Sequence, residues 1–292
     1  MRLVVTGASG ELGRRAAELL LATAPDHDLI LVTRNPGALA ALSRRGADVR
    51  AGDFDDPTSL RRAFAGGERM LLISTTELAR RGTQHENAVA AAATAGIAHV
   101  VYTSALAPAP PNPAVVAPSH HLTEEILRAS DLGWTILRNS LYAEYQAPEA
   151  AAALASGRLV HNRGTGRIAY VAREDCAAVA AAVLAAGGHT SRIYDVTGPK
   201  SYSAAELAEL YGALAGCCVE PVALDDAAFV DTLAVSLGQG DHARYGAELV
   251  ASFGRAIREG YFASCTRTVE LLTGQRATTL EQVLERSRDA CA

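Results

Sequence analysis

Leu3-Val4-Val5-Thr6-Gly7-Ala8-Ser9-Gly10-Glu11-Leu12-Gly13 is the stretch that decides the fold, because an apolar run ends on glycines and then resumes as a helical pattern. Glycine lets the backbone turn tightly and approach a phosphate without a side chain. The N-terminus of the following helix adds a partial positive charge. The spacing predicts a dinucleotide-binding turn, and the alternative is glycines in an ordinary surface turn. The residues expected to contact a cofactor are Thr6, Gly7, Ser9, Gly10, Glu11 and Leu12.

The composition indicates a globular α/β protein. The chain has 292 residues, of which 49% are hydrophobic, and a formal net charge of −5. This length suits one large α/β domain or a nucleotide-binding domain with a smaller lobe. Lys200 is the only lysine and no basic run occurs, so we expect no nucleic-acid partner. Alanine-rich stretches are too short and too interrupted to span a membrane. The sequence leaves open whether the protein is a monomer or a homodimer.

The cysteines predict a reducing compartment. Their number is five, which is odd, and they lack metal-ligand spacing, so we expect neither a disulfide framework nor a metal site. The adjacent Cys217 and Cys218 are expected to fill a strand. The chain begins at once with a predicted strand, and we therefore expect no signal peptide and a cytoplasmic protein.

The first half alternates apolar runs with amphipathic segments, which is typical of a doubly wound parallel sheet. Pro36 and Pro57 fit first-turn positions of helices, with Asn35 and Asp56 as the caps before them. We expect strands at Leu3–Val5, Leu29–Thr33, Asp48–Ala51, Arg69–Ile73, His99–Thr103 and Trp134–Leu137. The intervening helices are expected at Leu12–Leu21, Pro36–Arg45, Pro57–Ala63, Arg80–Ala95 and Ser119–Ala129.

The second half is less regular and predicts a smaller lobe over the carboxyl edge of the sheet. The division is expected at residues 1–146 for an NADP(H)-binding Rossmann domain and 147–292 for a substrate-binding α/β lobe, interleaved with the sheet around 168–196. A proline-rich stretch, Pro108–Pro118, follows the fifth strand. Proline cannot join a sheet or helix interior, so this stretch predicts an exposed loop, either a surface linker or a lid on the substrate side.

Arg34 predicts the choice of cofactor. It stands about 20 residues after the last glycine, where an NAD-selective site usually places Asp or Glu for the ribose 2′-hydroxyl. A guanidinium instead accepts a 2′-phosphate through a charge-assisted contact. The sequence therefore favours NADPH over NADH, against the alternative of a solvent-facing arginine at a helix start.

Polar residues at the ends of the third and fourth strands predict the rest of the cofactor site. Asp53 is expected to bond the adenine amino group, with the Phe54 ring beside the base; the alternative is an Asp in a turn. Ser74 and Thr75 have small side chains that allow close approach of the cofactor.

The fifth strand ends in Thr103-Ser104, and we expect both residues to contact the cofactor. In a short-chain dehydrogenase a serine here can also help hold the substrate carbonyl. The Tyr-x-x-x-Lys pair that supplies a proton in such enzymes is missing, since Lys200 lies far downstream and no tyrosine falls between Tyr102 and Tyr142. Either another group donates the proton or the chain performs no redox chemistry.

His120 and His121 are the candidate proton donors, because histidine titrates near neutrality. The alternative is that one or both face solvent or cap the helix that begins there. Tyr142, after the sixth strand, is an alternative donor or an aromatic wall. Asn139 and Tyr142 are expected to contact the substrate.

Several segments together resemble the NmrA-like, atypical short-chain dehydrogenase/reductase family, in particular its quinone and triphenylmethane reductases. The resemblance covers nearly the whole chain. It is carried by the glycine turn and by Arg34-Asn35-Pro36, Gly52-Asp53-Phe54, Gln84-His85-Glu86-Asn87, Val100–Ser104, Thr123-Glu124, Thr135–Asn139, Arg173-Glu174-Asp175, Tyr194–Pro199 and Leu272–Arg276.

The resemblance implies a Rossmann fold, bound NADP(H) and a cleft between the sheet and the C-terminal lobe. The family members usually carry Gly-Trp-Tyr after Arg-Asn, whereas this chain has Ser140-Leu141-Tyr142, which predicts a less aromatic cleft wall. The expected function is an NADPH-dependent reductase that transfers hydride to a small electron-poor acceptor such as a quinone, an enone or a related metabolite. The alternatives are a non-catalytic NADP(H)-sensing regulator and another cofactor-assisted reaction, such as isomerisation or ether reduction.

Overall fold

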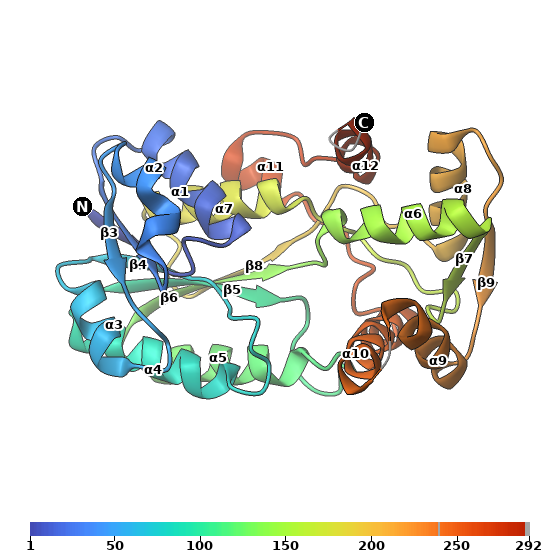
Figure 1. Ribbon diagram of the computed structural model, residues 1–292. Helices are drawn as coiled ribbons and strands as arrows, with labels where there is room; N and C mark the ends of the chain where they lie inside the picture. Colours follow the sequence, from blue (N-terminus) through green and yellow to red (C-terminus); the bar gives the residue numbers. More distant parts are fainter. Residues whose placement is uncertain (239, 290–292) are drawn as a thin grey trace.

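A seven-stranded parallel sheet forms the centre of the computed structural model, which describes residues 1–238 and 240–289 (Figure 1). The strand order β3-β2-β1-β4-β5-β6-β8 reverses direction between β1 and β4, and in such sheets ligands bind at the carboxyl ends of the strands near this reversal. The predicted doubly wound α/β fold is confirmed. The strands are β1 (Arg2–Val5), β2 (Asp28–Thr33), β3 (Asp48–Ala51), β4 (Arg69–Leu72), β5 (His99–Ala105), β6 (Gly133–Asn139) and β8 (Arg192–Val196).

Helices cover both faces of this sheet (Figure 1). On one face α1 (Glu11–Thr23) packs against α7 (Arg173–Ala185), and α11 (Thr268–Thr273) lies beside α7. On the other face lie α3 (Pro57–Phe64), α4 (Arg81–Thr94) and α5 (Ala117–Ala129). Both faces are sealed by buried aliphatic side chains of the strands, which explains why the strands read as continuous apolar runs.

A capping side chain explains the start of α3, and the lack of one accompanies a difference from expectation at residues 36–45. The side chain of Asp56 accepts hydrogen bonds from the backbone N–H groups of Thr58 and Ser59, so it caps α3 as predicted. Asn35 makes no such bond, and the single helix expected over Pro36–Arg45 is instead a 3-10 turn, η1 (Pro36–Leu39), followed by α2 (Ala40–Ser43). Gly37 lowers the helix propensity of this short segment.

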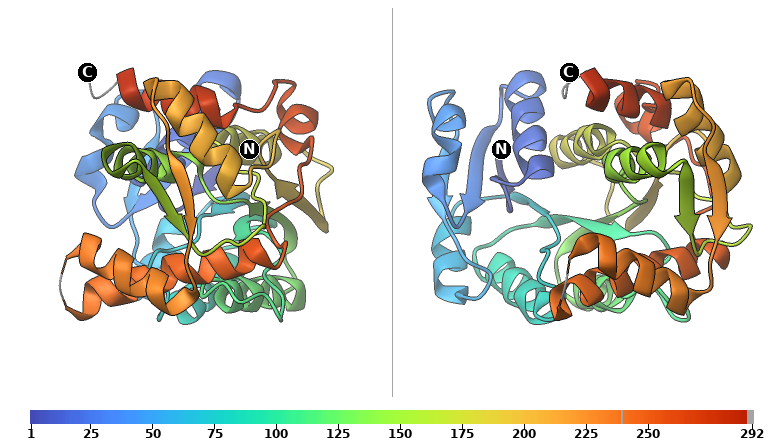
Figure 2. Two further views of the ribbon diagram at one scale, coloured as in Figure 1. Left: turned by 90° about the vertical axis from the view of Figure 1, so that its right-hand side faces the viewer. Right: turned by 45° about the vertical axis from the view of Figure 1, so that its right-hand side comes forward.

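The carboxyl edge of the sheet faces a second group of elements (Figures 1 and 2). A parallel pair, β7 (Arg158–His161) with β9 (Glu220–Ala223), forms a separate small sheet. Cys217 and Cys218 precede β9 as exposed residues of a turn, so the expectation that they fill a strand is wrong. The helices of this group are η2 (Ala143–Tyr145), α6 (Gln146–Ser156), α8 (Ala204–Ala215), α9 (Asp226–Leu237), α10 (Asp241–Arg258) and α12 (Leu280–Asp289).

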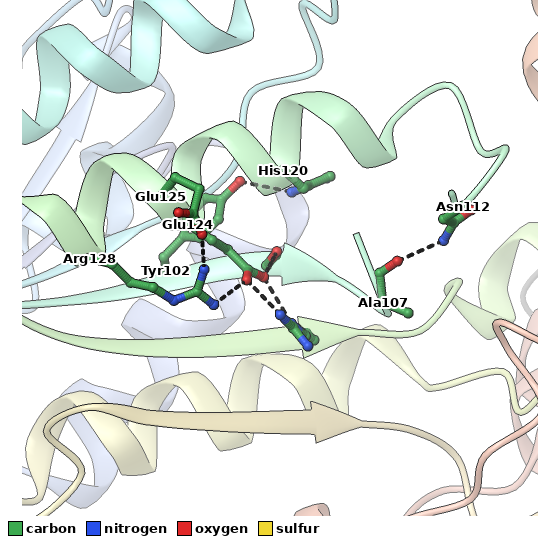
Figure 3. Close-up of polar contacts among 9 residues, drawn as sticks. Tyr102, Ala107, Asn112, His120, Glu124, Glu125 and Arg128 are labelled. Atoms are coloured by element: carbon green, nitrogen blue, oxygen red, sulfur yellow. Dashed lines mark hydrogen bonds and ion pairs between the residues drawn. The ribbon is translucent and has the colours of Figure 1, made fainter. Parts of the chain in front are cut away.

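The chain passes between the two parts more than once. Although α7 and β8 follow residue 147 in the sequence, they pack into the first sheet and its helical layer. The proline-rich stretch after β5 is not a free loop, because Ala114 is buried in the core of the second part and the backbone N–H of Val115 donates to Ser252 Oγ on α10. Asn112 also donates to the carbonyl oxygen of Ala107 (Figure 3). The stretch is therefore held against the second part of the chain.

No helix among residues 1–238 and 240–289 combines the length and the apolar character that crossing a membrane would require.

Candidate functional site

A cavity of about 690 Å³ lies at the carboxyl ends of the central strands and extends to the second part of the chain. Its volume and its place at the strand-order reversal suit a dinucleotide with room for a small acceptor. Thr6 and His121 lie outside its lining. The predicted site residues that do line it are Gly7, Ser9, Gly10, Glu11, Leu12, Arg34, Asp53, Phe54, Ser74, Thr75, Thr103, Ser104, His120, Asn139 and Tyr142.

The glycine turn brings backbone, rather than side chains, to the cavity. Gly7 has a φ of +60°, a conformation that favours glycine. A Cβ on Gly13 would lie 2.4 Å from the carbonyl oxygen of Gly7, so the start of α1 can pack against the turn only with glycine there. Gly10 provides no side-chain cap for α1, which leaves the first backbone N–H groups of the helix for an anion. Thr6 instead donates its hydroxyl to the carbonyl oxygen of Leu71 and accepts from Ile73 N–H, inside the sheet.

Arg34 supplies an uncommitted positive charge at the end of β2. Its side chain is exposed, lines the cavity and forms no ion pair within the part of the chain that the structure describes. Thr33 and Ser9 join this end of the cavity to the glycine turn through a hydroxyl–hydroxyl hydrogen bond of 2.8 Å. A 2′-phosphate at this position would neutralise the guanidinium without displacing any existing partner.

Buried polar atoms of the lining lack partners within the protein. They include Gln84 Oε1, Thr75 Oγ1, Asn139 Oδ1 and Ser140 Oγ. Buried polar groups are normally hydrogen-bonded, so four such atoms around one cavity indicate that a polar ligand completes them. The carboxylate of Asp53 accepts from Asp55 N–H while it lines the same cavity, and it keeps oxygen lone pairs for an adenine amino group. The residues present therefore fit a dinucleotide.

His120 is held at the cavity by a buried phenol. The Tyr102 hydroxyl and His120 Nδ1 are 2.8 Å apart (Figure 3). Burial holds the pKa of the His120 imidazole well below its usual value, and the charge of Arg81 lowers it further. Burial raises the pKa of the Tyr102 phenol, which therefore keeps its proton. We assign that proton as donated to Nδ1, which leaves the imidazole proton on Nε2.

His85, behind this pair, is also neutral. Its Nε2 accepts from Thr75 N–H at 3.2 Å, so its Nδ1 carries the proton and donates to Thr123 Oγ1. Burial lowers the pKa of His85 to about 3. His85 therefore positions the loop after β4 rather than exchanging protons at neutral pH.

The hydroxyl of Ser104 is already committed. It donates to Oε1 of Glu124, a fully buried carboxylate that also binds Arg138. Glu124 binds Arg128 as well (Figure 3). Ser104 therefore has no proton to offer a substrate carbonyl. The Glu124 carboxylate thus joins α5 to β5 through Ser104 and to β6 through Arg138. The Oγ1 of Thr103, by contrast, accepts from Ser74 N–H, a bond that does not use its hydroxyl proton.

Tyr142 forms part of an aromatic and cationic wall. The Arg173 guanidinium lies 5.1 Å from the ring centre of Tyr142 and 5.7 Å from that of Tyr145. Arg173 also pairs with Glu11 at the start of α1, so it bridges the glycine turn to the wall. Burial raises the pKa of the Tyr142 phenol, which therefore keeps its proton. Tyr142 therefore suits a wall better than a proton donor.

Arg81 and Arg173 line the cavity, but sequence reasoning assigned neither of them to the site. Arg173 belongs to one of the segments that carry the family resemblance, but the resemblance assigned no role to this residue. For Arg81 the sequence did contain a signal. A cation in the first turn of a helix is unfavourable because the helix dipole places partial positive charge there, so an arginine at this position suggests a functional role.

Comparison with known proteins places these features in a family. A family model described as NAD(P)H-binding matches residues 7–186. The chain is 34% identical over 280 residues to quinone oxidoreductase 2 of Escherichia coli K12, covering 96% of each chain. It is 31% identical over 237 residues to an NmrA-like family domain-containing oxidoreductase of Aspergillus flavus, covering 79% of this chain and 77% of the other.

Two solved structures are similar over nearly the whole chain. The NADPH complex of an NADPH-dependent quinone oxidoreductase from Escherichia coli matches with a TM-score of 0.92 and 32% identity, covering 98% of this chain and 99% of that chain. The NADP(H) complex of triphenylmethane reductase from Citrobacter sp. matches with a TM-score of 0.89 and 30% identity, with the same coverage of both chains.

Proposed function

Because the chain belongs to the NAD(P)H-binding, NmrA-like family, we propose that it is an NADPH-dependent reductase that transfers hydride to a small electron-poor acceptor, such as a quinone or an enone. The observation that carries this proposal is one continuous cavity, with the glycine turn and Arg34 among its lining and His120 and Tyr142 beside them. The names of the relatives support the same class of reaction, since they include a quinone oxidoreductase and an NAD(P)H azoreductase.

In this proposal the sheet end of the cavity holds the cofactor. The glycine turn and the start of α1 bind the diphosphate through backbone N–H groups, and Arg34 binds the 2′-phosphate that distinguishes NADPH from NADH. The unpartnered oxygens of Gln84, Thr75 and Asn139 accept hydrogen bonds from the adenosine and nicotinamide portions. Residues 1–146 would thus supply the cofactor site together with His120 and Tyr142 of the acceptor site, and 147–292 would add Arg173, Phe253 and Phe262.

His120 would polarise the acceptor. When bound, NADPH supplies the hydride from its nicotinamide ring. The neutral imidazole donates its Nε2–H to the acceptor oxygen and stabilises the negative charge that develops there. Since its pKa is held far below neutrality, His120 acts as a hydrogen-bond donor rather than as an imidazolium acid, and the final proton comes from water. Tyr142, Arg173 and Phe253 would wall the acceptor.

We also propose a cytoplasmic site of action, because four of the cysteines, Cys176, Cys217, Cys218 and Cys265, are free thiols in the described chain.

The test is turnover. Purified protein is mixed with NADPH and 1,4-naphthoquinone, and the near-ultraviolet absorbance of NADPH is followed together with formation of the hydroquinone. The proposal predicts enzyme-dependent loss of NADPH with equal production of hydroquinone, and slower turnover with NADH. Tight NADPH binding without consumption, across quinones and enones, would contradict it and favour the cofactor-sensing regulator.

A further inference from the structure

Arg81 is a buried cation that lines the cavity without a carboxylate partner. Its side chain stands at the start of α4 and is only 5% exposed. Nε donates to the carbonyl oxygen of Thr75 at 2.8 Å, and Nη1 donates to Ser119 Oγ at 3.1 Å. Nη2 makes no hydrogen bond to residues 1–238 or 240–289, and within those residues Arg81 forms no ion pair. Two neutral oxygens hold its geometry and leave its charge uncompensated.

The other buried arginines of the described chain are compensated. Arg163 pairs with the carboxylate of Glu149. Arg69 donates to the carbonyl oxygens of Val183 and Ala186 at the C-terminal end of α7, where the helix dipole favours a cation. Arg81 has neither arrangement, because it lies at the N-terminal end of a helix, where the dipole opposes it. Burial lowers the pKa of its guanidinium. A buried charge is costly unless it is paired, so this guanidinium is suited to an anionic ligand.

The order of strands separates this position from the anion sites of the proposed cofactor. The glycine turn follows β1, and Arg34 follows β2 on one side of it. Arg81 follows β4, which neighbours β1 on the other side. Ser119 and His120 belong to α5, which follows β5, the next strand outward. Arg81 therefore stands with His120 on the side of the cavity away from the 2′-phosphate site.

Apolar side chains line the same cavity as Arg81. They include Val116, just before α5, and Phe253, on α10 of the second part. The cavity thus combines an unpaired guanidinium with apolar lining. A ligand that matches this combination has an apolar ring system and one acidic substituent.

We propose that Arg81 forms an anion subsite of the acceptor pocket, so that the preferred acceptors carry a carboxylate or sulfonate group. This inference rests on the proposed reductase function, because only a reductase has an acceptor. Binding of an anion at the subsite can nevertheless be measured without turnover. Nη2 and the remaining proton of Nη1 bind the acidic group, while His120 bonds the reducible oxygen.

The test compares two redox-inert ligands of nearly equal shape. The complex of the protein with NADP+ is titrated calorimetrically with 4-hydroxybenzoate and with 4-hydroxybenzamide. We expect the acid to bind roughly 10- to 100-fold more tightly, as a charge-assisted contact predicts. In Arg81→Gln this preference should vanish with unchanged NADPH affinity, and in Arg81→Lys it should be partly retained. Arg80→Gln is the matched control, because Arg80 is exposed and pairs with Asp55 on the surface.

The outcomes separate this proposal from the reductase proposal. Equal binding of acid and amide by the unmodified protein overturns the subsite, and so does an acid preference that survives in a folded Arg81→Gln variant. A loss of NADPH affinity in Arg81→Gln and Arg81→Lys with the acid preference intact assigns Arg81 to the cofactor and likewise overturns it. An Arg81-dependent acid preference in a protein that oxidises no NADPH supports the subsite and contradicts only the reductase. Thermal melting of each variant verifies that it is folded.

Discussion

Replacing Arg34 with alanine should separate NADPH from NADH. The Arg34 side chain is exposed and makes no ion pair with the residues that the structure describes. Its removal therefore leaves no buried partner unsatisfied, and the free energy of unfolding should change by less than about 0.5 kcal/mol. The contact that it loses is one charge-assisted interaction with a phosphate, about 1.5–3 kcal/mol. Because the side chain is exposed, solvent screening favours the lower end, a roughly tenfold rise in the NADPH dissociation constant.

The assay is titration of each cofactor by nicotinamide fluorescence at low and at physiological salt. NADH affinity should stay the same, and the NADPH effect should shrink as salt screens the charge. Arg44→Ala is the matched control, since it removes an exposed arginine of the same segment that does not line the cavity. Equal losses for NADPH and NADH, or an equal effect of Arg44→Ala, would refute the assignment of Arg34 to the 2′-phosphate.

Three further changes test other parts of the site. Gly13→Ala places a methyl group 2.4 Å from the Gly7 carbonyl oxygen, so both cofactors should bind at least tenfold more weakly; unchanged titrations would mean that the turn does not hold the diphosphate. His120→Gln should lower kcat by roughly 10- to 100-fold at constant cofactor affinity, whereas His121→Gln should not, and equal rates in steady-state assays would remove His120 from the reaction. Glu124→Gln should cost about 3 kcal/mol of unfolding free energy in urea melts. Although burial acts to raise it, hydrogen bonds from Arg138 and Ser104 keep the folded-state pKa of Glu124 below its usual value. Its contribution is therefore present above about pH 4 and is lost as pH falls through the folded pKa, so an unchanged acid-unfolding midpoint in Glu124→Gln would argue against the network.

The cofactor half of the site was largely predictable because it follows from chain direction. Parallel strands bring their carboxyl ends to one edge, so residues just after each strand meet there without knowledge of any long-range contact. Arg34, Asp53 and Ser74 were found in this way, and each lines the cavity. Thr6 is an exception. It follows β1 but lies within hydrogen-bonding distance of β4, and its hydroxyl donates to the carbonyl oxygen of Leu71 rather than facing the cavity.

The acceptor half was less predictable because it depends on contacts between separate elements. Arg81 became a site residue only when α4 and α5 placed it beside Ser119. The proline-rich stretch was expected to be an exposed loop because nothing in its own sequence indicates a partner. Its hydrogen bond to Ser252, more than a hundred residues later, depends on tertiary packing.

The sequence by itself determined the parallel α/β fold, the glycine turn and the edge at which a nucleotide binds, because these follow from backbone conformation and strand direction. Only the tertiary structure decided which side chains can act there. His120 and His121 are adjacent in the sequence, but on a helix they point about 100° apart, and only His120 meets Tyr102 and the cavity. Ser104 and Glu124 look equally available in the sequence, yet burial beside Arg138 commits both to the fold. Long-range packing carries this information, because it decides which face of a helix is buried and which partners meet, and the local spacing of residues does not record it.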